Sequence, residues 1–234
     1  MGGADYADVS SETQSFIIIR HDVEFSPKRA HDLAELEHNE GITSTYFFQI
    51  SNHSYNILSR RNIDRILAIH EMGHRIGLHF HLNGSDNLQE IRSRIIYECG
   101  VMSQVLNIKI DRFSFHRPSR LVLENVIDIP GLINAYNPLY FSYIPEPSQE
   151  SLPEVKYIAD SRSEWSYTAP YIFPDDEFFR TYRKVQMLCH PYTWTPEGLP
   201  VLENLRLLIA ENRKEFIETL DSETKYVRNY LNAL

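Results

Sequence analysis

The stretch FIIIRHDVE, residues 16–24, joins an apolar run to a group of charged side chains. Four consecutive apolar residues with polar neighbours are typical of a strand that is buried on both faces of a parallel sheet. Side chains two residues apart in a strand share a face, so we expect Asp22 and Glu24 to point the same way where this strand ends. The stretch therefore predicts a buried strand that carries two carboxylates at one edge of a sheet.

The residues that follow predict a helix, and the alternation of strand and helix then continues along the chain. Ser26 and Pro27 supply an N-cap and a first-turn proline, and Gly41 ends the helical spacing. Further helices are expected around residues 63–70, 87–106, 122–127 and 199–232, and further strands at 43–50, 74–81, 113–115, 133–136, 140–144, 155–159 and 185–189. This alternation predicts an α/β fold with a mostly parallel sheet. Between residues 132 and 180 the sequence is irregular and rich in Pro and Tyr, which indicates long loops around a substrate cleft.

Length, charge and hydropathy limit the class of protein. A chain of 234 residues with 42% hydrophobic residues is long enough for one large domain. We expect a flexible N-terminus over residues 1–15 and a single domain over 16–234 that ends in a long C-terminal helix. The net charge of −9 argues against nucleic acid as a partner. The first 15 residues lack the pattern of a signal peptide, and no apolar run is long enough to span a membrane, so the expected location is the cytoplasm.

Polar side chains also follow the ends of other predicted strands. The C-terminal ends of parallel strands meet on one face of such a fold, and active sites form on that face. The polar sets expected to converge there are Asp22 with Glu24, His79 with His81, His116 with Arg117, Asp160, and His190. Carboxylates and imidazoles are ligands of divalent metals, so these sets predict a hydrolytic metal site.

The carboxylate pair and the histidine pair each have a structural interpretation as well. Two histidines two residues apart can arise by chance in a chain with 10 histidines. Asp22 and Glu24 can cap the following helix, or pair with Arg20 or Lys28. If they form a site, one carboxylate can act as a general base while the other binds a metal, because a bound cation helps to keep both ionised.

The remaining polar residues have two interpretations each. Arg117 forms a surface salt bridge, or it holds a catalytic carboxylate through bidentate hydrogen bonds. His190 is a packed aromatic residue, or a general acid, since imidazole titrates near neutral pH and can protonate a leaving amine. Asp160 is a turn residue, or it hydrogen-bonds His190 and sets its tautomer and pKa. Trp194 fills the core, or it stacks on a sugar ring.

Taken in order, five short motifs resemble those of the polysaccharide deacetylases of carbohydrate esterase family 4. The motifs are His21-Asp22-Val23-Glu24, Gly73-His74-Arg75-Ile76-Gly77-Leu78-His79, Phe115-His116-Arg117-Pro118, Asp160-Ser161-Arg162-Ser163-Glu164-Trp165 and Leu188-Cys189-His190. The resemblance covers residues 16–195. It implies a distorted, incomplete (β/α) barrel, TIM-like and of about seven strands. The chain looks most like a branch associated with surface-polysaccharide assembly.

The resemblance implies a role for each residue of the first two motifs. Asp22 corresponds to the catalytic base of the family, Glu24 to a metal ligand and His79 to the first metal-binding histidine. The family carries a second metal-binding histidine four residues after the first, and Asn83 occupies that position here. His81 is the nearest substitute, and the expected ligands are therefore Glu24, His79 and His81.

The later motifs supply the rest of the expected site. Arg117 corresponds to the arginine that orients the base, and His190 corresponds to the acid. The fourth motif lines the pocket and supports the acid, and Asp160 is its carboxylate. The residues expected to contact substrate are His116, Trp165, Trp194 and Asn83.

These expectations describe a metal-dependent hydrolase of carbon–nitrogen bonds other than peptide bonds. The substrate is an acetylated sugar or polysaccharide precursor, with N-acetyl preferred over O-acetyl, and the cofactor is a divalent metal, zinc before others. Because Asn83 stands where the family carries a metal-binding histidine, a second hypothesis is a protein that binds carbohydrate without catalysing its hydrolysis. A hydrolase of a small non-peptide amide is a third hypothesis, which the aromatic cleft disfavours because tyrosines stack on sugars.

Overall fold

The computed structural model describes residues 3–143, 154–161, 177–224 and 230. The chain divides into two compact units, Met1–Pro191 and Tyr192–Leu234. The single domain expected over residues 16–234 stays a prediction. The described part of the chain contains no helix that is both long enough and apolar enough to cross a membrane.

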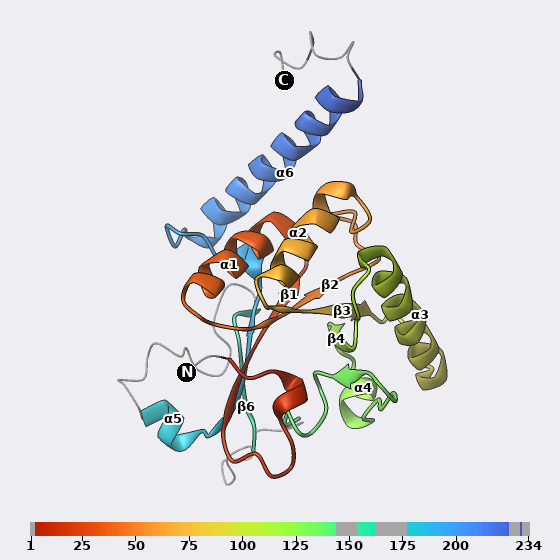
Figure 1. The fold of residues 1–234 in the computed structure, drawn as a ribbon, viewed down its shortest axis with the longest axis vertical. Coiled ribbons are helices and arrows are strands. Elements are labelled where there is room, and N and C mark those ends of the chain that lie inside the picture. Colours follow the sequence, from red (N-terminus) through yellow and green to blue (C-terminus); the bar gives the residue numbers. More distant parts are fainter. Residues whose placement is uncertain (1–2, 144–153, 162–176, 225–229, 231–234) are drawn as a thin grey trace. The chain divides into compact units, whose positions relative to one another are not determined.

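Seven parallel strands form one sheet in the first unit, in the order β5-β4-β3-β2-β1-β7-β6 (Figure 1). The sheet curls into a half-barrel, which confirms the predicted incomplete (β/α) barrel. β1, which carries the FIIIRHDVE stretch, lies in the interior of the sheet between β2 and β7. The bounds of the strands are β1 Phe16–Val23, β2 Thr45–Phe48, β3 Arg75–His81, β4 Arg112–His116, β5 Ile133–Asn134, β6 Lys156–Ala159 and β7 Lys184–Cys189.

The helices follow the predicted alternation. Ser26 caps the first helix, because its hydroxyl oxygen accepts a hydrogen bond from the backbone N–H of Arg29, and Pro27 opens the first turn. A short helix, α5, was not predicted, and the strand expected at 140–144 is absent from its described part, residues 140–143. The bounds of the helices are α1 Pro27–Asn39, α2 Arg60–Glu71, α3 Leu88–Leu106, α4 Arg120–Glu124, α5 Glu177–Thr181 and α6 Val201–Glu223.

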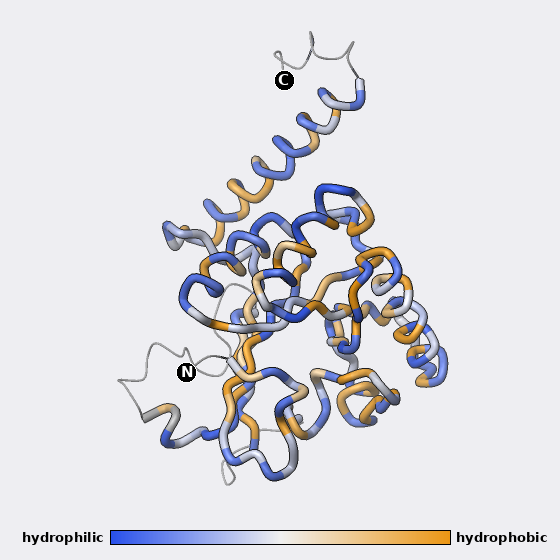
Figure 2. Tube along the Cα trace, viewed as in Figure 1, coloured by the Kyte–Doolittle hydropathy of each residue, from blue (hydrophilic) through white to orange (hydrophobic). Residues whose placement is uncertain are grey.

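The core consists of apolar side chains from the strands and from the inner faces of the helices. Figure 2 shows hydrophobic residues along the strands, whereas hydrophobic and hydrophilic residues alternate along α6. Gly77 lies where β3 meets β2, and a Cβ atom at this position would be 2.5 Å from the ring of Phe47. A glycine is therefore required for the two strands to pack around that buried ring.

The described part of the N-terminal segment, residues 3–15, packs against the sheet, where the sequence predicted a flexible stretch over residues 1–15. Asp5 accepts hydrogen bonds from Arg75 at 2.6 Å and from Arg112 at 2.7 Å, two residues that lie at the starts of β3 and β4. Tyr6 is fully buried and donates to Gln186 Oε1 at 3.0 Å. These partners are distant in the sequence, which is why the sequence alone predicted a loose segment.

A buried polar network joins α1 to the strands on the side of β1 that His21 faces. Glu37 Oε1 lies 2.7 Å from His21 Nε2, and Glu37 Oε2 accepts from Ser44 at 2.6 Å and from Tyr46 at 2.8 Å. Burial alone would raise the pKa of Glu37, but His21 and the two hydroxyl donors lower it to about 2. The carboxylate therefore stays ionised and holds α1 against the sheet.

Candidate metal centre

Arg20 and Asp22 share a face of β1, because they are two residues apart in a strand. Arg20 is fully buried, and its Nη2 atom donates to Asp22 Oδ2 at 2.9 Å and to the hydroxyl of Tyr136 at 2.9 Å. Nη1 donates to Gln186 Oε1 at 3.1 Å. The ion pair that the sequence offered as a structural interpretation of Asp22 therefore exists, and the surrounding donors and acceptors fix its geometry.

Asp22 is held on both carboxylate oxygens. While Oδ2 accepts from Arg20, Oδ1 accepts from the hydroxyl of Ser114 at 3.3 Å, and Oδ2 lies 3.7 Å from His79 Nδ1. Burial raises the pKa of Asp22, but the charge of Arg20, with those of His79 and His190, brings it below its ordinary value. Asp22 is thus an anion whose two oxygens are both engaged by neighbouring side chains.

His79 lies opposite Ser114 in the pairing of β3 with β4, and one hydrogen bond orients its ring. Nδ1 lies 2.8 Å from Ser114 Oγ, while that hydroxyl donates its own proton to Asp22. Ser114 therefore accepts the Nδ1 proton of His79, and this network assigns the lone pair of the neutral ring to Nε2. An outer hydrogen bond of this kind is what orients a histidine that binds a metal.

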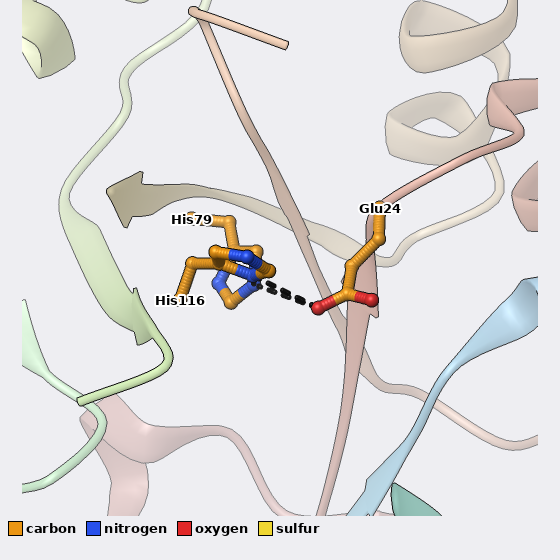
Figure 3. A group of neighbouring side chains, drawn as sticks. All are labelled: Glu24, His79 and His116. Atoms are coloured by element: carbon orange, nitrogen blue, oxygen red, sulfur yellow. Dashed lines mark hydrogen bonds and ion pairs between the residues drawn. The ribbon is translucent and has the colours of Figure 1, made fainter. Parts of the chain in front are cut away.

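Three ligand atoms converge beyond the ends of β1, β3 and β4. His116 Nδ1 lies 2.9 Å from Glu24 Oε1 and 3.3 Å from His79 Nε2, and the distance from His79 Nε2 to Glu24 Oε1 is 3.9 Å. Figure 3 shows both rings turned toward the carboxylate. All three atoms lie within 4.8 Å of one another. Burial raises the pKa of Glu24, but the hydrogen bond from His116 and the nearby imidazoles of His79 and His190 bring it well below its ordinary value.

These donors suit a divalent transition metal. Two imidazole nitrogens and one carboxylate oxygen are the protein ligands of many catalytic zinc sites, where a fourth position remains open to water or substrate. The hydrogen bond from His79 to Ser114 leaves Nε2 with the lone pair that a metal requires. The chemistry of the group therefore fits the predicted ion, through His116 where we had expected His81.

His81 is not part of this group, and its assignment as a ligand is corrected on geometric grounds. Its Nδ1 atom accepts a hydrogen bond from the backbone N–H of Asn83 at 2.9 Å, and its ring centre lies 4.9 Å from that of His116. His79 and His81 would have to bend their strand to bind one ion. Because β3 pairs with β4 in regular register, His116 reaches the ion position from the neighbouring strand instead.

His190 and Asp160 meet at the ends of β7 and β6. Asp160 Oδ1 lies 2.6 Å from His190 Nδ1, and both carboxylate oxygens accept the backbone N–H of His190 at 3.0 Å. His190 Nε2 lies 4.0 Å from Glu24 Oε1. Burial lowers the pKa of His190, but the hydrogen bond and charge of Asp160, followed by Asp22 and Glu24, raise it above its ordinary value.

The sequence predicted Arg117 as the residue that holds Asp22, but among the described residues no hydrogen bond or ion pair joins the two. The guanidinium that contacts Asp22 belongs to Arg20, which precedes it on the same face of the same strand. The period of two in a strand could have identified Arg20 from the sequence. Ser114 could be found only once β3 and β4 were known to be neighbours.

A cavity of about 550 Å³ is lined by two of the three candidate ligands, Glu24 and His116. His116, which the sequence predicted to contact substrate, is one of the candidate ligands and also lines the cavity. Asn83 lies on the cavity wall as well. Trp165 lies outside the described residues, and Trp194 belongs to the second unit, so both assignments stay predictions. The residues that line the cavity are Glu24, Phe25, Gln49, Ser51, Asn52, His53, Ser54, His81, Asn83, His116 and Arg117.

Comparison with known proteins finds similar solved structures but no match by sequence. No protein-family model and no curated protein matches the sequence. A family 4 carbohydrate esterase from Bacillus anthracis is 14% identical, with a TM-score of 0.44 over 85% of this chain and 76% of its own. Other similar structures include a peptidoglycan deacetylase from Bacillus subtilis and a chitin deacetylase from Colletotrichum lindemuthianum.

Two further neighbours show how members of this family differ. An acetyl xylan esterase from Clostridium thermocellum, solved with a cobalt ion, is 13% identical, with a TM-score of 0.45 over 85% of this chain and 84% of its own. A family 4 pseudoenzyme from Bacillus anthracis is 11% identical, with a TM-score of 0.49 over 87% of this chain and 62% of its own. Because these TM-scores are below 0.5, a functional proposal has to rest on the side chains of this chain.

Proposed function

We propose that this protein is a metal-dependent hydrolase that removes an acetyl group, preferably N-acetyl, from a sugar or polysaccharide precursor. The observation that carries the proposal is the convergence of Glu24 Oε1, His79 Nε2 and His116 Nδ1 beside a cavity. The order of the five sequence motifs supports the same reaction class.

Glu24, His79 and His116 would hold the ion, with zinc expected before other divalent metals. When bound, such an ion polarises a carbonyl group and lowers the pKa of a bound water. Ser114 fixes the tautomer of His79 for this purpose, and Arg20 and Asp22 hold Ser114 and His79 in place. In this proposal Asp22 positions a ligand, in place of the role of base that the resemblance implied.

His190 is the group that moves protons. Its Nδ1 atom is bound to Asp160, so Nε2, 4.0 Å from Glu24 Oε1, is the ring nitrogen nearest the ligand group. Nε2 accepts a proton from the water that attacks the acetyl carbonyl, and Asp160 stabilises the imidazolium that results. The same Nε2 then gives the proton to the amine as the carbon–nitrogen bond breaks, which leaves acetate and the free amino sugar.

The cavity suits a sugar. Its volume of about 550 Å³ lies in the range of small-molecule sites, and Gln49, Asn52 and Asn83 on its wall are amides that can bind hydroxyl groups. Phe25 offers an apolar face. The hypothesis of a carbohydrate-binding protein without activity rests on Asn83, and in our proposal His116 would take the place of the histidine that the family carries at that position.

The test is to measure metal content and acetate release together. Protein loaded with zinc, cobalt or nickel is incubated with N-acetylglucosamine oligomers and with an O-acetylated xylan, and acetate is quantified. We expect the wild-type protein to bind one ion per chain and to release acetate from the N-acetyl substrate. The variant His190→Ala should retain the metal but no longer release acetate. Folded protein that binds none of the three metals and releases no acetate would contradict the proposal.

A further inference from the structure

Arg117 has a backbone conformation that its sequence does not favour. Its φ angle is 50°, in the left-handed region that residues other than glycine rarely adopt. The next residue is Pro118, and a residue before proline is normally extended. The surrounding structure must therefore impose this conformation, and strain of this kind gathers at functional sites.

The left-handed turn has a consequence for the cavity. His116 is the last residue of β4, and successive side chains of an extended strand point to opposite faces. His116 and Arg117 nevertheless line the same cavity, together with Glu24. The turn thus brings a guanidinium to the wall of the pocket that also borders the candidate metal ligands.

The charge of Arg117 has no counterpart on this wall. Among the residues the structure describes, no carboxylate forms an ion pair with Arg117, and the one carboxylate that lines the cavity, Glu24, is engaged by His116. The other polar residues on the wall carry amides, hydroxyls or imidazoles, Gln49 and Asn83 among them, and none of these groups is a carboxylate. The wall therefore offers an arginine that no described carboxylate neutralises, beside the group that would hold the reacting acetyl.

We propose that Arg117 binds an anionic group, a carboxylate or a phosphate, on the acetylated sugar. A guanidinium binds either group through two parallel hydrogen bonds, which gives both affinity and orientation. This inference rests on the proposed function for the identity of the sugar. It adds that the substrate is acidic, and that Arg117 determines this specificity.

Binding is measured by calorimetry with three probes: N-acetylglucosamine, N-acetylglucosamine 1-phosphate and N-acetylmuramic acid. The first is neutral, and the other two carry a phosphate and a carboxylate. We expect at least one anionic probe to bind about tenfold more tightly than the neutral one, since a charged hydrogen bond of this kind is worth about that factor. Whichever of the two binds more tightly identifies the source of the charge.

The variant Arg117→Gln should reduce this preference to near unity, whereas Arg120→Gln should keep it. Arg120 is exposed, pairs with Glu124 and does not line the cavity, so it controls for the loss of one positive charge. Arg117→Gly accepts a positive φ angle, and it provides the same test if the glutamine variant does not fold. The inference would be overturned if all three probes bound with equal affinity or if none of them bound. It would also be overturned if the Arg117 variants kept the preference for the anionic probe.

The hydrolase proposal and the anion-site proposal can fail separately when the calorimetry is combined with measurements of acetate release. A charge preference that depends on Arg117, in protein that releases no acetate from any substrate, would retain the anion site and contradict the hydrolase. Acetate release from neutral and anionic substrates at equal kcat/KM would retain the hydrolase and contradict the anion site.

Discussion

The hydroxyl of Ser114 lies 2.8 Å from Nδ1 of His79, and the two residues face each other across the pairing of β3 with β4. The same hydroxyl donates to Asp22 Oδ1 at 3.3 Å. A chain of hydrogen bonds therefore runs from the ion pair of Arg20 and Asp22, through Ser114, to a candidate metal ligand. The centre depends on this buried support as well as on the three atoms that would bind the ion.

Removing this hydroxyl should weaken metal binding. In Ser114→Ala, Nδ1 of His79 loses its acceptor, so the ring is free to turn or to change tautomer. We expect the affinity for zinc to fall by roughly 10-fold to 100-fold, as for other groups that orient metal ligands. Titration calorimetry measures it, and Ser44→Ala is the matched control, because Ser44 is also buried but contacts Glu37 instead. Equal zinc affinity in the two variants would contradict this role.

Neutralising Asp22 should destabilise the protein. Asp22→Asn leaves the fully buried guanidinium of Arg20 without its anionic partner, and breaking a buried pair in this way costs about 3–5 kcal/mol of unfolding free energy. Urea unfolding measures it. Asp32→Asn removes a carboxylate from an exposed pair with Lys28, and we expect a change of less than about 1 kcal/mol.

The same variant distinguishes the two roles of Asp22. If Asp22 positions His79 through Ser114, Asp22→Asn will lose zinc affinity together with activity. A folded Asp22→Asn protein that keeps wild-type zinc affinity and loses only acetate release would instead identify Asp22 as the base.

The Glu37 network should stabilise the fold against acid. The pKa of Glu37 in the folded state is about 2, below its ordinary value of 4.5. The stabilisation is therefore complete above pH 4.5 and is lost as the pH falls from 4.5 toward 2, with a size of roughly 3 kcal/mol at most. In Glu37→Gln, urea unfolding should show lower stability at pH 7 and a smaller further loss below pH 4.5. Glu124→Gln, at an exposed pair, should follow the wild type. Parallel pH profiles for Glu37→Gln and the wild type would show that the carboxylate has no such role.

Much of the fold could be predicted because its pattern is local. A strand is predicted by an apolar run such as residues 16–19. The start of α1 is predicted by a serine and a proline, and the ends of helices by the glycines that follow them. The N-terminal segment is different, since Asp5 is held by Arg75 and Arg112. Contacts over such separations in the sequence cannot be inferred from composition, and the segment therefore looked loose.

The candidate site likewise contains residues that the sequence could predict and residues that it could not. Glu24, His79 and the pair of His190 with Asp160 follow from motifs at the ends of single strands, and the structure brings them together. His116 replaces His81 because the group draws on neighbouring strands, and the order of strands had to be known before that choice. Arg20 was visible two residues before Asp22, but we considered it only as a structural ion pair.

The most direct test of the metal centre is the zinc affinity of His116→Ala compared with that of His81→Ala. The two histidines lie opposite each other at the ends of β4 and β3, so the variants are closely matched. We predict that calorimetry will show one zinc ion per wild-type chain, a loss of at least about a hundredfold in affinity for His116→Ala, and no change for His81→Ala. Loss of zinc in His81→Ala with binding retained in His116→Ala would contradict the account.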